Sequence, residues 1–242
     1  MDNIDVAYAR EKGLTVINTP GASSQSVAEL VMGHLFAVSR FLFASYKNME
    51  TGEFAKLKKS YAKGVELRGK TIGIVGFGRI GQSLASYALG AGMNVVAIDQ
   101  YTETATISLN IGGKPLEVQI TPTNDLSSVI GNLDYISLHV PKQADGSAVI
   151  QMKEFELMKK GVRIVNAARG GVINETDLKE AISQGIVAAA ALDVFDNEPN
   201  PDASLTSHVS IACTPHIGAA TIEAQDRIGT ELADQIKSAL NH

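Results

Sequence analysis

An arginine, a carboxylate and a histidine each lie just beyond a strand-like apolar run in the second half of the chain. The three segments are Asn166-Ala-Ala-Arg169-Gly-Gly, Asp193-Val-Phe-Asp-Asn-Glu198-Pro and Thr214-Pro-His216-Ile-Gly. Open α/β sheets bind ligands at the carboxyl ends of their strands, so we expect these side chains to meet at one edge of a sheet. A guanidinium holds a carboxylate, and a histidine beside a carboxylate moves protons near neutral pH. This set predicts transfer of a hydride and a proton.

Each of the three residues also has a structural interpretation. Arg169 could cap a helix, Glu198 could be a solvated loop acid, and His216 could simply end a strand. Because all three follow strand ends, their joint occurrence favours a catalytic site.

A glycine-rich turn earlier in the chain predicts a nucleotide site. Gly76-Phe-Gly78-Arg-Ile-Gly81 lies between an expected strand at 71–77 and an expected helix at 79–89. Its glycines allow a tight turn and the close approach of a pyrophosphate, which the amides of Arg79 and Ile80 can meet at the helix N-terminus. A glycine turn without a nucleotide is the alternative, and the strand–turn–helix context argues against it.

Asp99 adds the second half of the dinucleotide pattern. It closes the next expected strand, 94–98, and lies 18 residues beyond Gly81. A carboxylate there accepts hydrogen bonds from the adenosine ribose and repels a 2′-phosphate. No arginine follows it nearby, so the sequence favours NAD over NADP.

The alternation of strands and helices after Lys70 predicts an α/β fold with a doubly wound parallel sheet, that is, a Rossmann-like cofactor domain. We expect strands at 71–77, 94–98, 135–140, 163–167, 187–194 and 208–213, and an earlier strand at 14–18. A helix with a capping box at Ser26–Glu29 should run to about Ser45 and bury an apolar face. Residues 106–120 predict a β-hairpin, to which we assign no function, and 221–240 a final amphipathic helix.

Three further features have both a structural and a functional interpretation. His34 lies on the apolar face of the 26–45 helix, and we expect a packed core or interface histidine, since one imidazole without a partner has no mechanism. The lysine-containing polar segment 47–69 predicts a solvated loop, with a phosphate-contacting loop as the alternative. Cys213 is expected to be a buried structural thiol, because a nucleophile would need an orienting third group.

The composition describes an ordinary globular chain. Apolar residues make up 45% of its 242 residues, enough for a buried core in one or two domains. A net charge of −5 without a dense basic run argues against nucleic acid or a membrane surface as a partner. Cys213 is the only cysteine, and the sequence contains neither a bilayer-spanning apolar stretch nor a signal-peptide pattern. We therefore expect a cytoplasmic protein without a metal site, whose redox chemistry comes from a bound cofactor.

Motifs along essentially the whole chain resemble the NAD-dependent D-2-hydroxyacid dehydrogenase family. Besides the three segments above, they are Val16-Ile-Asn-Thr-Pro-Gly21, Ser26-Val-Ala-Glu29, Leu67 to Gln82, Leu138-His-Val-Pro141, Met158-Lys and Glu223-Ala. Residues 58–67 and 218–232 are most similar to short bacterial D-3-phosphoglycerate dehydrogenases. The resemblance implies an enzyme of serine biosynthesis that oxidises D-3-phosphoglycerate to 3-phosphohydroxypyruvate.

Other functions remain open beside that one. The chain could be another 2-hydroxyacid dehydrogenase, such as a glyoxylate or hydroxypyruvate reductase, or a non-enzymatic NAD(H)-responsive scaffold of the same fold. A methyltransferase with a glycine-rich loop is disfavoured by the full fingerprint and by Arg169, Glu198 and His216.

The resemblance also implies roles for individual residues. Arg169, Glu198 and His216 match the family's catalytic arginine, glutamate and histidine, and Glu198 argues against the formate-oxidising branch, which has glutamine there. Asp193 matches the residue that contacts the nicotinamide carboxamide. The implied cofactor-binding set is Gly76, Gly78, Arg79, Ile80, Gly81, Asp99, His139, Val140, Pro141, Ala167, Ala168, Arg169, Asp193, His216, Gly218 and Ala219.

Finally, the resemblance implies a cofactor domain inserted into a substrate domain. We expect a substrate-domain remnant at 1–22, the NAD-binding domain at 23–217 and a helix returning to the substrate domain at 218–242. The chain begins, at Asp2-Asn-Ile-Asp5, near the end of the first portion of the substrate domain, so this stretch alone should bind NAD(H) without catalysing turnover. The family pairs through its cofactor domains, which together with the apolar face of the 26–45 helix predicts a homodimer acting on a small 2-hydroxy or 2-keto acid.

Overall fold

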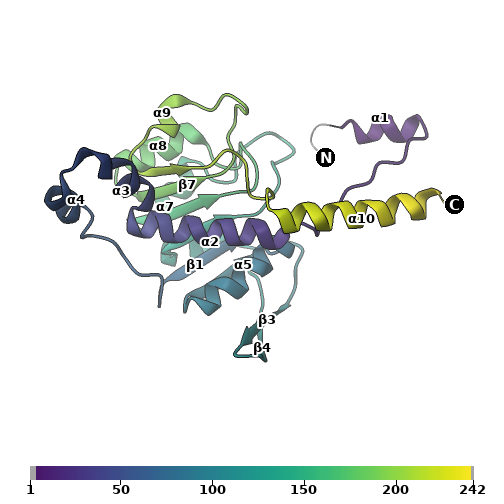
Figure 1. Ribbon diagram of the computed structural model, residues 1–242, viewed down its shortest axis with the longest axis horizontal. Coiled ribbons are helices and arrows are strands. Elements are labelled where there is room, and N and C mark those ends of the chain that lie inside the picture. The colour runs from purple at the N-terminus through teal and green to yellow at the C-terminus, as the bar shows by residue number, and fades with distance from the viewer. Residues whose placement is uncertain (1–3, 241–242) are drawn as a thin grey trace.

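The computed structural model describes residues 4–240 and is built on a six-stranded sheet (Figure 1). The strands lie in the order β2-β1-β5-β6-β7-β8, and every neighbouring pair is parallel. Their bounds are β1 (Thr71–Val75), β2 (Asn94–Ile98), β5 (Tyr135–Leu138), β6 (Val162–Asn166), β7 (Val187–Leu192) and β8 (Ile211–Cys213). The doubly wound α/β fold predicted from the sequence is confirmed, and the strand order reverses between β1 and β5, where such sheets bind ligands.

Helices cover both faces of this sheet and enclose two hydrophobic cores. α2 (Ser24–Arg40) and α5 (Arg79–Gly90) cover one face, where Leu35, Leu84 and Ile72 are fully buried. α7 (Met152–Leu157), α8 (Glu175–Ser183) and α9 (Ala203–Thr206) cover the other, around Phe155 and Leu178. Because both faces are covered, the central strand β5 is buried at every residue, including the polar Ser137.

The segment before the sheet differs from the sequence-based expectation. Residues 14–18 form no strand, because no strand in the described part of the chain pairs with them, and α1 (Val6–Glu11) precedes them. The capping box was wrong: α2 begins at Ser24, and the Ser26 hydroxyl instead lies 2.8 Å from that of Thr221. The expectations that fall on Asp2 and Asn3 lie outside the described residues.

The predicted long helix is also interrupted. Phe41 has a left-handed φ of 57°, which ends α2 and starts α3 (Leu42–Asn48). The polar segment that follows contains the short helices η1 (Met49–Thr51) and α4 (Phe54–Ser60). On α4, Lys56 pairs with Glu53 at 3.0 Å, and Figure 1 places α4 at the opposite end of the molecule from α10. This favours the solvated interpretation of the lysines.

Two elements project from the body. β3 (Ala105–Ile111) and β4 (Lys114–Ile120) form the predicted hairpin, which Ala105 and Ile107 anchor in the core beside α5. α6 (Leu126–Val129) and η2 (Ile130–Asn132) then lead into β5. The final helix, α10 (Ile222–Leu240), extends away from the sheet, and Ala224 is its single buried residue (Figure 1).

Within residues 4–240, no single helix is long and apolar enough to cross a membrane; the bent pair formed by α2 with α3 and η1 passes that test by length and composition alone.

Candidate functional site

Three adjacent strands deliver the three predicted catalytic residues to one edge of the sheet. Arg169 follows β6, Glu198 follows β7 and His216 follows β8, and these strands are direct neighbours in the order β6-β7-β8. Since all three strands are parallel, their carboxyl ends lie at the same edge. The loops that extend from these ends carry the side chains.

Glu198 and His216 are in direct contact. His216 Nδ1 lies 2.7 Å from Glu198 Oε2, and the Phe195 amide donates to Glu198 Oε1 at 2.9 Å. Burial raises the pKa of Glu198, but the hydrogen bonds from His216 and Phe195 and the charges of His216 and Arg169 outweigh it, so the net pKa is below the ordinary value. The carboxylate therefore stays ionised, occupies Nδ1 and leaves Nε2 as the ring nitrogen that can face a substrate.

The backbone of His216 is held in an unusual conformation. Its φ is 54°, in the left-handed region that non-glycine residues seldom adopt. The following two amides are both anchored: Ile217 N donates to Asp193 Oδ1 at 2.9 Å and Gly218 N to Asp193 Oδ2 at 2.8 Å. Such conformations persist where the surroundings determine them, and they are common at functional sites. Asp193, which is 1% exposed, thus shapes the loop that presents the histidine.

The Arg169 loop is fixed by the side chain of Asn166. Asn166 Oδ1 accepts from the Ala168 amide at 3.1 Å, and Asn166 Nδ2 donates to the Arg169 carbonyl at 3.0 Å. Gly170 allows this loop to touch the Glu198 loop, because a Cβ there would collide with the Phe195 carbonyl. The guanidinium is exposed, with Nη1 donating to the Ala168 carbonyl at 2.7 Å. Sequence reasoning missed this role of Asn166, although its place at the end of an expected strand was a signal for it.

The glycine turn lies between β1 and α5, as predicted. Gly76 has a φ of 92°, and a Cβ there would lie 2.5 Å from the His139 carbonyl oxygen, so the turn packs against the end of β5. A Cβ on Gly81 would collide with the Gly76 carbonyl. At Gly78, by contrast, no atom lies within 4 Å of that position. The first amides of α5, those of Arg79 and Ile80, have no partner inside the helix by its geometry, so they can meet an anion in this space.

Asp99 lies where the ribose of a dinucleotide would be expected. Its Oδ2 accepts from the Phe77 amide at 2.7 Å, and its Oδ1 accepts from the Tyr101 and Thr102 amides at 2.7 and 2.8 Å. Burial raises the pKa of Asp99, but these backbone hydrogen bonds outweigh it and lower the pKa overall. A fixed negative charge at this point suits ribose hydroxyl donors and opposes a 2′-phosphate.

The end of β5 supplies further predicted cofactor residues, His139, Val140 and Pro141. His139 Nε2 lies 2.8 Å from Ser137 Oγ, whereas its buried Nδ1 has no hydrogen-bond partner. Burial lowers the pKa of His139 to about 4, so the ring is neutral at ordinary pH. An unpaired buried nitrogen beside the glycine turn is the kind of atom a bound ligand satisfies. The geometry therefore fits a dinucleotide.

The remaining predicted cofactor residues lie in the same loops. Ala167 and Ala168 precede Arg169, and Gly218 and Ala219 follow His216. Cys213 ends β8 with a half-buried side chain, and burial raises the pKa of its thiol to about 11. It is therefore poorly suited to act as a nucleophile. Among the described residues, no group of three or more His, Cys, Asp and Glu side chains could hold a metal ion.

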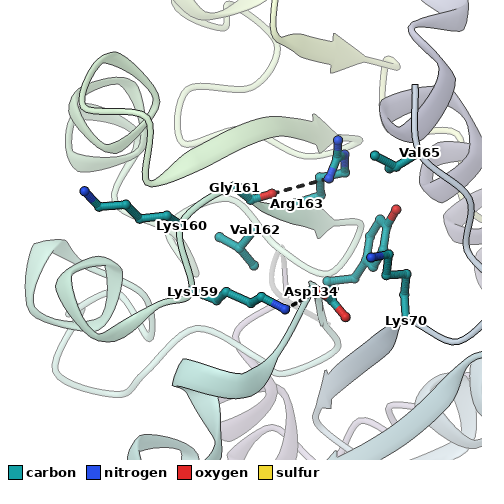
Figure 2. Close-up of a pocket in the computed structure, with 9 residues that line it drawn as sticks. Val65, Lys70, Asp134, Lys159, Lys160, Gly161, Val162 and Arg163 are labelled. Atoms are coloured by element: carbon teal, nitrogen blue, oxygen red, sulfur yellow. Dashed lines mark hydrogen bonds and ion pairs between the residues drawn. The ribbon is translucent and has the colours of Figure 1, made fainter. Parts of the chain in front are cut away.

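A small cavity of about 50 Å³ lies elsewhere, at the amino ends of the strands (Figure 2). Tyr135 and Val162, the first residues of β5 and β6, line it, and Lys159 pairs there with Asp134 at 2.7 Å. Figure 2 shows Lys160 pointing away from this group. Because it lies at the opposite edge from Arg169, Glu198 and His216, this cavity is not part of the candidate site.

Comparison with known proteins agrees with this geometry. Residues 32–218 match the family described as D-isomer specific 2-hydroxyacid dehydrogenase, NAD binding domain. The chain is 44% identical to a hydroxypyruvate reductase of Thermotoga maritima, over 98% of this chain and 73% of the relative. It is 41% identical to a D-3-phosphoglycerate dehydrogenase of Methanocaldococcus jannaschii, over 99% of this chain but only 44% of the relative.

A solved structure has the same architecture. It is a putative D-isomer specific 2-hydroxyacid dehydrogenase from a Polaromonas species, with a TM-score of 0.86 and 30% identity over 100% of this chain and 72% of that chain. The glycine turn, the parallel sheet and the similarity along the whole chain all indicate the same family. This chain belongs to the D-isomer specific 2-hydroxyacid dehydrogenase family and carries its NAD-binding domain.

Proposed function

We propose that the protein is an NAD-dependent oxidoreductase of D-2-hydroxy acids, in which Arg169, Glu198 and His216 carry out the chemistry. The observation that carries the proposal is the 2.7 Å contact between His216 Nδ1 and Glu198 Oε2, on loops that adjoin the Arg169 loop at the carboxyl edge of the sheet. An acid–base pair next to a guanidinium suits a substrate that carries a carboxylate beside an alcohol or ketone.

The side chains divide the work by their chemistry. Arg169 binds the substrate carboxylate through its planar fork of donors. In the direction of oxidation, His216 Nε2 takes the proton of the C2 hydroxyl, and Glu198 stabilises the imidazolium that results. In the direction of reduction, the same nitrogen returns a proton to the carbonyl oxygen. NAD, when bound, accepts the hydride from C2, and NADH supplies it in reverse.

The cofactor would lie along the edge already described. The turn at Gly76 to Gly81 and the first amides of α5 would hold the pyrophosphate, Asp99 the adenosine ribose and Asp193 the nicotinamide end. His139, Val140 and Pro141 would line the adenine side. The fixed carboxylate of Asp99 favours NAD over NADP, since a 2′-phosphate would face a negative charge.

The proposed substrate is D-3-phosphoglycerate, oxidised to 3-phosphohydroxypyruvate in the cytoplasm as a step of serine biosynthesis. The M. jannaschii relative, named for that activity, supports this choice. A second candidate is hydroxypyruvate reduction, which the name of the T. maritima relative favours. On the keto-acid side the two reactions differ by one phosphate group, because 3-phosphohydroxypyruvate is hydroxypyruvate that carries a phosphate on C3.

Steady-state assays of the full-length protein test the proposal. NADH oxidation should be seen with hydroxypyruvate or its 3-phosphate, and the ratio of the two kcat/KM values identifies the substrate. A protein that binds NADH but turns over no 2-keto acid would contradict the enzymatic function and favour a cofactor-responsive scaffold, whose partner binding should then change with NADH.

A further inference from the structure

A hydrogen-bonded chain, buried at His34 and Asp193 and half-buried at Thr214, connects helix α2 to the loop that carries His216. His34, on α2, is 1% exposed, and its Nε2 lies 3.1 Å from Thr214 Oγ1. Thr214 Oγ1 in turn donates to Asp193 Oδ1 at 2.6 Å. The sequence alone predicts a packed core or interface histidine at this position, because it shows no partner for the ring. The structure confirms the burial and supplies the partner, 180 positions along the chain.

The donors in this chain can be assigned by counting hydrogens. The Thr214 hydroxyl has one hydrogen, and it points to Asp193. The Asp193 carboxylate acts as an acceptor, because the Ile217 and Gly218 amides also donate to it. His34 must therefore donate from Nε2 to the Thr214 oxygen. Burial lowers the pKa of His34, against a smaller opposing effect from the Asp193 charge, which is consistent with a neutral ring protonated at Nε2.

This chain reaches the histidine through Asp193. Asp193 accepts from the two amides that directly follow His216, the residue with the left-handed φ of 54°. The fit is tight, since a Cβ on Gly218 would lie 3.1 Å from Asp193 Oδ2. Without the His34 donor, Thr214 Oγ1 would keep its hydrogen bond to Asp193 but lose the second contact that fixes its position.

We propose that His34 is a positioning residue for the reaction: its Nε2–H fixes Thr214, Thr214 fixes Asp193, and Asp193 fixes the His216 loop at the nicotinamide end of the site. This inference rests on the proposed function. It assigns His34 no contact with substrate or cofactor. It predicts that replacing His34 impairs binding only at the nicotinamide end of the dinucleotide.

The test compares three variants of the full-length protein with wild type. His34→Leu removes the donor, and His34→Gln replaces it with an amide N–H of similar reach. Ser39→Ala is the matched control: Ser39 is a buried residue of the same helix, and its hydroxyl lies 2.7 Å from that of Tyr135, away from the site. Each variant is assayed for kcat, for NADH affinity and for the affinity of ADP-ribose, which lacks the nicotinamide.

His34→Leu should lower kcat by about tenfold, as loss of a supporting hydrogen bond does at other sites. It should also lower the affinity for NADH but leave the affinity for ADP-ribose unchanged. His34→Gln should restore most of both losses. Ser39→Ala should lower Tm but leave kcat and both affinities unchanged. The proposal is overturned if His34→Leu retains wild-type kcat and NADH affinity, or if it weakens ADP-ribose as much as NADH. A wild-type protein that neither binds NADH nor turns over would instead refute the proposed function.

A measurement on the wild-type protein avoids the risk that a variant misfolds. Long-range ¹H–¹⁵N NMR of ¹⁵N-histidine-labelled protein reports which ring nitrogen carries the hydrogen. The His34 ring, assigned by its loss in His34→Gln, should be neutral with the hydrogen on Nε2. A hydrogen on Nδ1 would overturn the proposal, since Nε2 could then donate nothing to Thr214.

Discussion

At the scale of single residues, the Glu198 carboxylate is placed to stabilise the protonated form of His216, because its Oε2 lies 2.7 Å from His216 Nδ1. Because the pKa of Glu198 is held below its ordinary value, the carboxylate is ionised throughout the range in which histidines titrate, and its effect is lost only as the pH falls through that lowered pKa. We therefore expect Glu198→Gln to destabilise the protonated ring of His216. Keto-acid reduction, which needs the protonated ring, should slow at neutral pH and recover as the pH falls.

The measurement is the pH profile of kcat/KM for reduction, in wild type and Glu198→Gln. The acidic shift in the variant is the expected result. If the two pH profiles coincide, Glu198 has no effect on proton transfer by His216, although the two side chains lie 2.7 Å apart.

Asp99 should decide which dinucleotide is bound. Its carboxylate is fixed by three backbone amides, so it cannot turn away from a 2′-phosphate without losing them. Fluorescence titration should show NADH binding at least about tenfold more tightly than NADPH, a difference of ~1.4 kcal/mol, with Asp99→Ser narrowing the gap. Equal affinities in the wild type would remove Asp99 from the specificity site.

The sequence predicted the meeting of Arg169, Glu198 and His216 for a definite physical reason. Each follows a strand, and parallel strands end at a common edge. The link from His34 to Thr214 could not be predicted, because it depends on how α2 packs across the sheet, and no spacing in the sequence encodes that packing.

At the scale of elements, the junction of β1 and α5 contains the open space that the proposed function assigns to the pyrophosphate. Gly78→Ala should fold normally, because no atom lies within 4 Å of the added Cβ, but should weaken NADH by about tenfold since the methyl group occupies that space. Gly90→Ala is the matched control at the other end of α5, where the added Cβ also meets nothing within 4 Å.

Both variants should be compared by thermal denaturation and NADH titration. Gly90→Ala should keep wild-type affinity. If Gly78→Ala keeps it too, the open space at the turn is not the pyrophosphate site.

Strands with buried partners on both sides were predictable, and isolated elements were not. The apolar runs of β1, β5, β6 and β7 specify central parallel strands. Residues 14–18 have a similar apolar character but no neighbouring strand to pair with, so the strand predicted there from composition was wrong. The end of α2 at Phe41 could not be predicted either. A single residue with a left-handed backbone does not change the helical spacing of apolar side chains in the sequence.

At the scale of the whole molecule, the proposed homodimer has a different basis from the one expected. The apolar face of α2 packs inside the chain, with Val31 and Leu35 fully buried, so it cannot be the contact surface. Large apolar side chains are instead exposed along the end of α2, α3, η1 and α4, at Phe36, Leu42, Phe43, Tyr46, Met49 and Phe54. Exposed apolar clusters of this kind mark interaction surfaces.

Light scattering at micromolar concentration should give a molecular mass twice that of one chain. Leu42→Lys should lower the measured mass to that of a single chain. Leu157→Lys is the control, because Leu157 is similarly exposed, at 53% against 50%, but lies on α7. A wild-type monomer would contradict the dimer, and dissociation by Leu157→Lys would place the interface on another face.

The central claim, that His216 carries the proton for an NAD-dependent reaction, is tested most directly by His216→Asn in the full-length protein. Asparagine keeps an N–H near Glu198 but cannot transfer a proton from the position of Nε2. His208→Asn, at the opposite end of β8, is the control. We predict that His216→Asn loses about 10²- to 10⁴-fold in kcat with NADH affinity nearly unchanged, while His208→Asn keeps both. Wild-type turnover by His216→Asn would contradict the mechanism.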